Sequence, residues 1–396
     1  MRPYSRVYAS VNLDAIEGNI KAMRAAVPET TAIMGIVKAD GYGHGAVPVA
    51  KTIEPFVRAY GTATLEEAVM LRRHGIKKWI LVLGPVHPSQ YEELLEWDIR
   101  PAVFQYEKAD LLSQLAVKKH LTASIHIALD TGMSRIGLKP DEASADTVEK
   151  ISRLPGIQIE GLFTHFARAD EADKSAYEAQ FSAYEQFCAL LKKRGIEIPL
   201  CHCSNSAAIV EGLASNRLDM VRAGISIYGL YPSLEVAAGR VALQPAMELK
   251  TAVTYIKEVE PGTSISYGGT FTAQRPMRVA TIPVGYGDGY SRNLSNRGEV
   301  LICGRRAKIL GRVCMDQFMA DVTDIPEARE DAEVTLLGRD GEEEITAWEL
   351  AERSGGYHYE LLCNVGKRIP RVYIKKGQIA GKKDYFKDIC EDFIAR

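Results

Sequence analysis

The stretch Thr31-Ala-Ile-Met-Gly-Ile-Val-Lys38 decides the fold class of this 396-residue chain. It is a mostly apolar, β-capable run that lies between two segments of helical period. Apolar residues before it recur every three or four positions, which predicts an amphipathic helix over 13–27, and a second helical stretch follows near 46–54. A buried strand between two helices is typical of a parallel βαβ unit.

The same alternation continues to about residue 222. The predicted strands are 32–38, 59–63, 79–84, 101–104, 124–129, 157–163, 200–203 and 220–222. Further helices are predicted at 65–74, 88–97, 107–119 and 171–193. Eight such strands within about 200 residues predict an α/β fold with a closed (β/α)₈ TIM-type barrel. An open doubly wound sheet fits less well, because Gly41, Gly43 and Gly45 lack the Gly-x-Gly-x-x-Gly spacing.

The pattern of apolar residues changes after Pro232. Strand-like runs separated by turn signals replace the helical period. These runs are 247–259, 278–284, 299–302, 307–310, 317–322 and 333–337, with one helix near 346–353 and another from about residue 385. We therefore expect a barrel over 1–234 and a mainly β C-terminal domain over 235–396, with residues 1–11 as a candidate pairing partner of the second domain.

Composition excludes several classes of function. A net charge of −2 argues against nucleic acid or an anionic membrane as the main partner. Apolar stretches stay shorter than the roughly 18 residues that a membrane span needs. Seven cysteines without framework spacing indicate free thiols in the cytoplasm. The cluster Cys201-His202-Cys203 could suggest a metal, but strand alternation points Cys and His to opposite faces, so we predict no metal site.

Lys38 closes the first predicted strand with a lone amine. Burial lowers the pKa of a lysine, and a neutral amine is both a nucleophile and a base. The alternative is a lysine whose ammonium reaches solvent from the strand end. The first interpretation is favoured because barrel enzymes place their chemistry at the carboxyl ends of the strands. Unusual polar segments follow five of the predicted strands: Lys38, Asp130–Arg135, Thr164-His165, Ser204–Ser206 and Arg222–Ile225.

The last two of these segments predict a phosphate site. Ser204-Asn205-Ser206 supplies hydroxyls at a predicted helix start, and Gly224-Ile225 supplies amides that a ligand can approach closely. Ordinary helix capping is the alternative, and it is compatible with phosphate binding. A lysine amine beside a phosphate site suggests pyridoxal 5′-phosphate held as a Schiff base. Arg222 is the candidate partner of the pyridine nitrogen, and a guanidinium cannot accept a proton, so the ring would stay neutral and favour rapid reprotonation of a carbanion.

At this point the chain resembles the alanine racemase family, pyridoxal-phosphate enzymes with a barrel and a β domain. The resemblance runs from about residue 5 to residue 373. It rests on eight segments in order: Val37–Gly45, Asp130–Gly137, Asn205–Ala208, Arg222–Gly229, Ser266–Gly268, Gly285–Tyr290, Cys314–Asp316 and Tyr359-Glu360.

The resemblance implies an isomerase that interconverts L- and D-alanine by a two-base mechanism on a pyridoxal phosphate external aldimine and supplies D-alanine for peptidoglycan. Lys38 would carry the cofactor and act as one base, and Tyr267 of a second subunit would act as the other. Racemisation requires two such groups, because one removes the α-proton and the other returns a proton to the opposite face. The composite site implies a homodimer.

The resemblance also implies the binding residues. Those for the cofactor are Tyr42, His165, Asn205, Ser206, Arg222, Gly224, Ile225 and Tyr359. His165 and Arg222 would polarise the network around the catalytic tyrosine, and most of the others would contact the phosphate. Those for the substrate are Arg135 and the Met315 amide, which would hold the carboxylate, and Tyr286, which would stand at the entrance corridor.

Two positions depart from the family pattern. Ala128 stands where many relatives carry a lysine, often carbamylated, that orients the arginine corresponding to Arg135, and we expect weaker carboxylate binding. His358 stands where a proline usually precedes the tyrosine, which would shift the loop of Tyr359.

Other functions on related scaffolds remain open. The nearest is a serine or broad-specificity amino-acid racemase, which the phenol of Tyr359 disfavours by crowding a larger side chain. A pyridoxal-phosphate decarboxylase would not be expected to keep Ser266-Tyr267-Gly268. A non-catalytic cofactor carrier would lack the second domain, and a Schiff-base aldolase would lack the absorbance of the cofactor.

Overall fold

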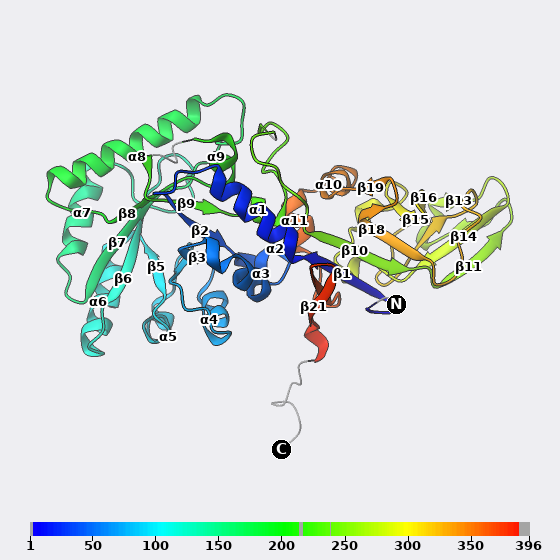
Figure 1. Ribbon diagram of the computed structural model, residues 1–396, viewed down its shortest axis with the longest axis horizontal. Helices are drawn as coiled ribbons and strands as arrows, with labels where there is room; N and C mark the ends of the chain where they lie inside the picture. The colour runs from blue at the N-terminus through cyan, green and yellow to red at the C-terminus, as the bar shows by residue number, and fades with distance from the viewer. Residues whose placement is uncertain (1–2, 214–216, 238, 388–396) are drawn as a thin grey trace, which may run out of the picture. The chain divides into compact units, whose positions relative to one another are not determined.

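The computed structural model describes residues 3–213, 217–237 and 239–387. The chain divides into two compact units (Figure 1). The first, the barrel unit, comprises residues 15–41 and 46–245. The second, the β unit, comprises residues 1–14, 42–45 and 246–396.

The barrel unit is built on a parallel eight-stranded sheet in the order β8-β7-β6-β5-β4-β3-β2-β9. Its strands are β2 (Ala32–Ile36), β3 (Ala59–Thr62), β4 (Ile80–Val82), β5 (Arg100–Val103), β6 (Ala123–Ala128), β7 (Ile157–Phe163), β8 (Leu200–His202) and β9 (Met220–Ala223). Two hydrogen bonds join the end strands: the Asp219 amide donates to the Cys201 carbonyl at 3.1 Å, and the Arg222 amide donates to the Ser204 carbonyl at 2.9 Å. The predicted barrel is confirmed, and the doubly wound alternative is wrong.

Helices alternate with these strands. They are α1 (Leu13–Ala25), α3 (Ala46–Ile53), α4 (Leu65–Arg73), α5 (Tyr91–Glu96), α6 (Tyr106–Lys118), α7 (Glu142–Ser152), α8 (Ser175–Lys193) and α9 (Ser206–Glu211). Local chemistry sets several of their starts. A capping box joins Thr64 and Glu67 at the start of α4, and the Asp141 side chain caps α7.

Three local predictions for the barrel unit were wrong. Helix α7 was not predicted, because its apolar residues are few, although Ala145, Val148 and Ile151 form a buried face. The long helix begins at Ser175 and not at residue 171. Strand β2 ends at Ile36, so Lys38 lies in the turn α2 (Lys38–Tyr42), which is not regular helix because Ala39 and Asp40 have φ of 51° and 50°.

The β unit is built on an eleven-stranded sheet with the path β11-β14-β17-β16-β15-β18-β10-β1-β20-β21, and β19 pairs with β18. Its strands are β1 (Val7–Asn12), β10 (Met247–Ala252), β11 (Tyr255–Val259), β14 (Met277–Ile282), β15 (Glu299–Ile302), β16 (Arg305–Leu310), β17 (Phe318–Asp321), β18 (Glu333–Asp340), β19 (Glu343–Ile345), β20 (Arg371–Lys375) and β21 (Gln378–Lys383). Strand β1 pairs antiparallel with β10 and parallel with β20. The predicted mainly β domain is confirmed.

Several elements of the β unit differ from the predicted ones. The run 247–259 is two strands, β10 and β11, separated by Val253 and Thr254. Strands β19, β20 and β21 were not predicted. Strand β19 is a three-residue Glu-Glu-Ile segment, β20 has a charged residue at each end, and β21 is largely exposed, so no apolar alternation marks it. Helix α10 (Ala347–Ser354) was predicted, whereas α11 (His358–Cys363) was not. A helix was expected from about residue 385; the structure has a short 3₁₀ turn at Tyr385–Lys387, and the remainder of this prediction lies outside the described residues.

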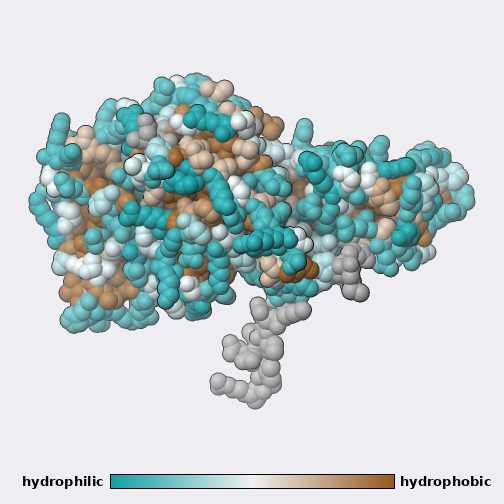
Figure 2. All heavy atoms as spheres, viewed as in Figure 1, coloured by the Kyte–Doolittle hydropathy of each residue, from teal (hydrophilic) through white to brown (hydrophobic). Residues whose placement is uncertain are grey.

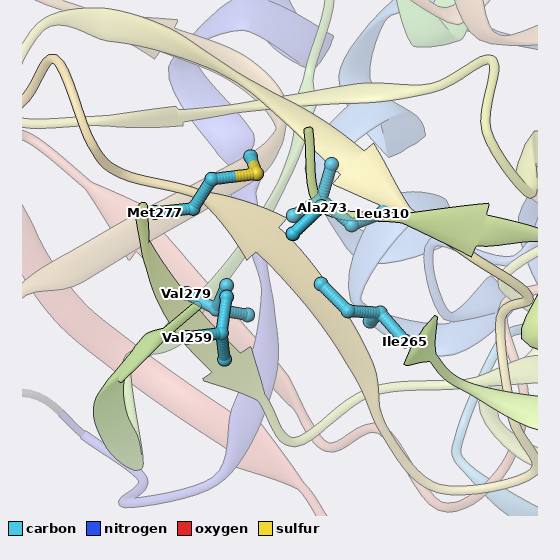
Figure 3. Close-up of a cluster of buried hydrophobic side chains, with 6 residues drawn as sticks. All are labelled: Val259, Ile265, Ala273, Met277, Val279 and Leu310. Atoms are coloured by element: carbon cyan, nitrogen blue, oxygen red, sulfur yellow. The ribbon is translucent and has the colours of Figure 1, made fainter. Parts of the chain in front are cut away.

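A small apolar core lies beneath one hairpin of the β unit. Val259, Ile265, Ala273, Met277, Val279 and Leu310 form this cluster (Figure 3). The hairpin pairs β12 (Ser264–Ile265) with β13 (Phe271–Thr272), and its turn η5 (Tyr267–Gly269) carries Tyr267. Burial of Ile265 in the core therefore anchors the hairpin that presents this tyrosine.

Polar residues cover most of the face seen in Figure 2, with apolar residues scattered among them. Within the described residues, none of the helices combines the length and the apolar character that crossing a membrane requires.

Candidate active site

Four of the predicted site residues line one cavity at the carboxyl ends of the barrel strands. The cavity measures about 60 Å³. Its walls are Lys38, Leu83, Ala128, Leu129, Met133, Arg135, Ile136, Phe163, His165 and Arg222. The side chains that carry charge or a titratable nitrogen are thus held against an otherwise apolar surface, where electrostatic interactions are stronger than in water.

Arg222 is almost completely buried at the end of β9. Its Nη1 donates to His202 Nδ1 and to the His202 carbonyl, both at 2.8 Å. Its Nη2 donates to the carbonyls of Thr164 at 2.7 Å and Cys203 at 3.0 Å, and to His165 Nδ1 at 3.2 Å. Burial lowers the pKa of this guanidinium to about 10, so it remains a cation at neutral pH and acts only as a donor.

His165 faces the cavity as a neutral ring. Burial, followed by the positive charges of Arg222, Arg135 and Lys38, holds the pKa of its imidazole well below the usual range. Because Nδ1 accepts a hydrogen bond from Arg222, the proton of the neutral ring must lie on Nε2. His165 can therefore offer an N–H donor to a partner but is not an additional cation at neutral pH.

The predicted phosphate loop brings Ser206 and Gly224 together. The Ser206 hydroxyl oxygen accepts from the amides of Gly224 at 2.8 Å and Ser226 at 3.5 Å. The hydroxyl proton takes no part in these two contacts and can be donated to an anion. Asn205 caps α9, since its side-chain oxygen accepts from the Ala208 amide at 3.1 Å. The capping interpretation therefore holds for Asn205, while Ser206 presents a donor at the same loop.

Two predicted phosphate residues meet within the β unit. The rings of Tyr42 and Tyr359 lie edge to face, with centroids 6.1 Å apart. Tyr359 lies in the first turn of α11, directly after His358. The His358 ring is buried and stacks on Trp348 at a centroid distance of 3.6 Å. His358, the departure from the family pattern, thus occupies the start of a regular helix.

Tyr286 and Met315 lie on adjacent turns of the β unit. The Tyr286 amide donates to the Cys314 carbonyl at 3.0 Å, and the Gly287 amide donates to the Met315 carbonyl at 2.9 Å. A Cβ at Gly285 would lie 2.2 Å from the Cys314 carbonyl oxygen, so only glycine allows this approach. Both side chains are exposed, Tyr286 to 43% and Met315 to 52%.

Tyr267 is the most exposed of the predicted catalytic residues, with 70% of its surface accessible. Ser266 before it has a φ of 66°, a conformation that costs about 1–3 kcal/mol in a residue other than glycine. The Ser266 hydroxyl donates to the Arg312 carbonyl at 2.6 Å and thereby holds this turn. The held turn thus presents Tyr267 to solvent.

Two histidines near Arg222 were missed as site residues. His202 bonds Arg222 directly, and His126 Nδ1 lies 2.9 Å from His202 Nε2. The strand alternation that argued against a metal site also placed His202 on the face opposite to the neighbouring cysteines, and His202 is fully buried. The signal for His202 was therefore present but was used only to reject a metal.

The donor chemistry of these groups fits pyridoxal 5′-phosphate. Lys38 supplies a primary amine for an aldehyde, the Ser206 loop supplies donors for an anion, and the buried Arg222 supplies a donor that cannot take up a proton. A (β/α)₈ barrel with this rim, followed by a mainly β unit, defines a pyridoxal-phosphate enzyme of the barrel-plus-β-domain class.

Comparisons with known proteins identify the family within this class. One family model, described as alanine racemase, N-terminal domain, matches residues 11–232, and a second, described as alanine racemase, C-terminal domain, matches residues 246–373. An alanine racemase from Halothermothrix orenii is 46% identical over 375 residues, which cover 94% of this chain and 98% of the relative. The chain belongs to the alanine racemase family.

Solved structures give the same result. The structure of an alanine racemase from Clostridium difficile has a TM-score of 0.92 and 37% identity, and the match covers 97% of this chain and all of that one. The structure of an alanine racemase from Bacillus anthracis with bound L-Ala-P has a TM-score of 0.91 and 37% identity, and covers 98% of this chain.

Proposed function

We propose that the protein is an alanine racemase that interconverts L- and D-alanine with pyridoxal 5′-phosphate, and that its two acid/base groups are Lys38 and Tyr267. The observation that carries the proposal is the barrel cavity in which Lys38, Arg135, His165 and Arg222 converge. When bound, the cofactor supplies an electron sink that makes the α-proton of the amino acid acidic.

Arg222 and His165 prepare the site for a carbanion that is reprotonated quickly. The guanidinium of Arg222 has its donors fixed by carbonyl and imidazole acceptors, so its orientation is set before any ligand arrives. Because a guanidinium cannot accept a hydrogen bond, it would not stabilise a protonated pyridine nitrogen of the cofactor and would thereby limit delocalisation of the charge. A strongly delocalised carbanion lives longer and is open to transamination, whereas a less stabilised one favours racemisation.

Racemisation also needs proton transfer on both faces of a planar centre. Lys38 provides a primary amine at the cavity, in the same lining as Arg222 and Arg135. His165 cannot be the second base, because its Nδ1 accepts from Arg222 and its Nε2 already carries the proton, so we assign the second role to a group from outside the cavity wall. Tyr267 fits this role because its phenol is exposed on a held turn.

We further propose that Tyr267, Tyr286 and Met315 act in the site of a second copy of the chain, in a homodimer. Their exposure on the β unit supports this assignment, because an exposed side chain is available to enter the site of another chain. Arg135 would bind the substrate carboxylate through its planar fork, with the Met315 amide as a further donor.

Within the cell, we propose a cytoplasmic enzyme that supplies D-alanine for peptidoglycan. The cysteines support this location: among the described residues, Cys188, Cys201, Cys203, Cys303, Cys314 and Cys363 are free thiols.

The test follows conversion of L-alanine to D-alanine together with uptake of solvent deuterium at the α-carbon. The wild-type enzyme should convert and label both enantiomers. Tyr267→Phe should stop conversion but retain deuterium uptake into one enantiomer only, because one base remains on one face. A protein that takes up deuterium into neither enantiomer with cofactor added would contradict the proposal. Faster turnover of L-serine than of L-alanine would favour the serine racemase alternative.

A further inference from the structure

Four side chains form a continuous line of hydrogen bonds through the interior of the barrel, and we call them the barrel relay. Arg222 Nη1 lies 2.8 Å from His202 Nδ1, and His202 Nε2 lies 2.9 Å from His126 Nδ1. His126 Nε2 lies 3.3 Å from Glu160 Oε2, which also accepts from Arg100 Nε at 3.2 Å. The relay therefore connects the arginine of the active site to a partly exposed carboxylate on β7.

The chemistry of its end members fixes the direction of every hydrogen bond. A guanidinium can only donate, so His202 Nδ1 must accept from Arg222. The neutral His202 then carries its proton on Nε2 and donates it to His126 Nδ1. His126 in turn carries its proton on Nε2 and donates to Glu160, which accepts as a carboxylate. No other pair of neutral tautomers satisfies all three contacts.

Burial supports these protonation states. The side chains of His126 and His202 are fully buried, and burial lowers the pKa of each imidazole below its usual value. Burial of Glu160 opposes its ionisation, but the hydrogen bond from His126 and the charge of Arg100 outweigh it, so the pKa of the carboxyl lies below its usual value. Two neutral rings thus lie between a cation and an anion.

The neighbouring residues pack closely around the rings of His126 and His202. A Cβ at Gly161 would lie 2.3 Å from His126 Nδ1, so glycine at this position makes space for the ring. The His202 ring stacks on Phe163 with an interplanar angle of 13°. The two rings are therefore confined by packing, and their remaining freedom is the choice of tautomer.

We propose that Glu160 and His126 are positioning residues for the reaction, which hold Arg222 in place by fixing the tautomer of His202. This inference rests on the proposed function. Without an acceptor at His126 Nδ1, His202 can move its proton to Nδ1, where it faces the donors of Arg222. Two opposed donors at this distance repel, and the guanidinium would shift from the position that its present hydrogen bonds define.

The test compares variants that keep or remove the acceptors. Glu160→Gln retains an acceptor for His126, whereas Glu160→Leu removes it, and His126→Phe removes the acceptor for His202 while keeping a ring. Glu197→Gln, at an exposed carboxylate before β8, is the matched control. The ring nitrogens of ¹⁵N-histidine-labelled holoenzyme report which nitrogen of His202 carries the proton, and the eight histidines of the chain can be assigned by substitution.

We expect the proton on Nε2 in the wild type, Glu160→Gln and Glu197→Gln, and a shift towards Nδ1 in Glu160→Leu and His126→Phe. The kcat of these last two should fall about tenfold, with KM changed by less than about twofold. An unchanged His202 tautomer in both, or an unchanged kcat, would overturn the relay. If His126→Phe does not fold, Glu160→Leu decides alone. A tautomer that responds as expected in an enzyme without racemase activity would instead count against the proposed function.

Discussion

The carboxylate of Asp288 links three segments of the β unit and holds the turn that carries Tyr286. Its Oδ2 accepts from Arg6 Nη1 and from the Gly285 amide, both at 3.0 Å. Its Oδ1 accepts from Arg6 Nη2 at 2.5 Å and lies 3.5 Å from Arg368 Nε. The Asp288 side chain is fully buried, while those of Arg6 and Arg368 are 36% and 35% exposed.

Removal of this carboxylate should be costly because it leaves buried donors without an acceptor. Breaking a buried ion pair typically costs about 3–5 kcal/mol, and exposure of both arginines places Asp288→Ala near the lower end, at about 3 kcal/mol. Asp288→Asn keeps an acceptor for one arginine nitrogen and should cost about 1–2 kcal/mol. The matched control is Asp316→Asn, since Asp316 pairs with the same Arg368 at 2.7 Å but is 56% exposed, and it should cost less than about 1 kcal/mol.

Urea unfolding followed by circular dichroism measures these losses, with the transition slope compared between variants. The order Asp288→Ala, Asp288→Asn, Asp316→Asn is expected. The reasoning from burial would be refuted if the free energy of unfolding of Asp288→Ala lay within about 1 kcal/mol of the wild-type value. It would also be refuted if Asp316→Asn lowered the free energy of unfolding as much as Asp288→Ala does.

Further substitutions test other parts of the site. Gly285→Ala should lower the free energy of unfolding by about 2 kcal/mol or more and raise KM, because the new Cβ would lie 2.2 Å from the Cys314 carbonyl oxygen. The control is Gly18→Ala in α1, where a Cβ would have no atom within 4 Å. In the same unfolding experiment it should stabilise the protein by about 0.5 kcal/mol. Ala128→Lys in bicarbonate should lower KM for alanine, because a carbamylated lysine would give Arg135 an anionic partner in the same cavity. An unchanged KM would contradict the expectation that Ala128 weakens binding of the substrate carboxylate. Tyr359→Ala should raise turnover of serine relative to alanine, and an unchanged ratio in a competition assay would show that the phenol does not set specificity.

The sequence predicted the fold and the site best where an apolar, strand-like run is followed directly by a chemically unusual polar residue. The apolar runs that gave the barrel strands are buried on both sides, so their signal is strong, and they place Lys38, His165 and Arg222 at strand ends without further information. Strand β21 could not be predicted because it is largely exposed and shows no apolar alternation, and its partner β20 pairs in turn with β1, which lies far away in the chain.

The barrel relay could not be predicted from the sequence for a different reason. His126, Glu160 and His202 are separated by 34 and 42 positions in the chain, and only the register of β6, β7 and β8 brings their side chains together. A lone histidine in a buried strand gives no sign of its partner. Pairings of this kind depend on tertiary structure and cannot be predicted from local pattern.

The central claim is that Lys38 and Tyr267 act as a pair drawn from two copies of the chain. The direct measurement is the racemase activity of a mixed dimer, prepared by co-expressing Lys38→Ala and Tyr267→Phe chains that are each inactive alone. In a symmetric dimer with shared sites, each mixed dimer contains one intact site, so the co-expressed preparation should recover about a quarter of the wild-type activity. No recovery in a preparation shown to contain mixed dimers would place both groups in one chain and contradict the account.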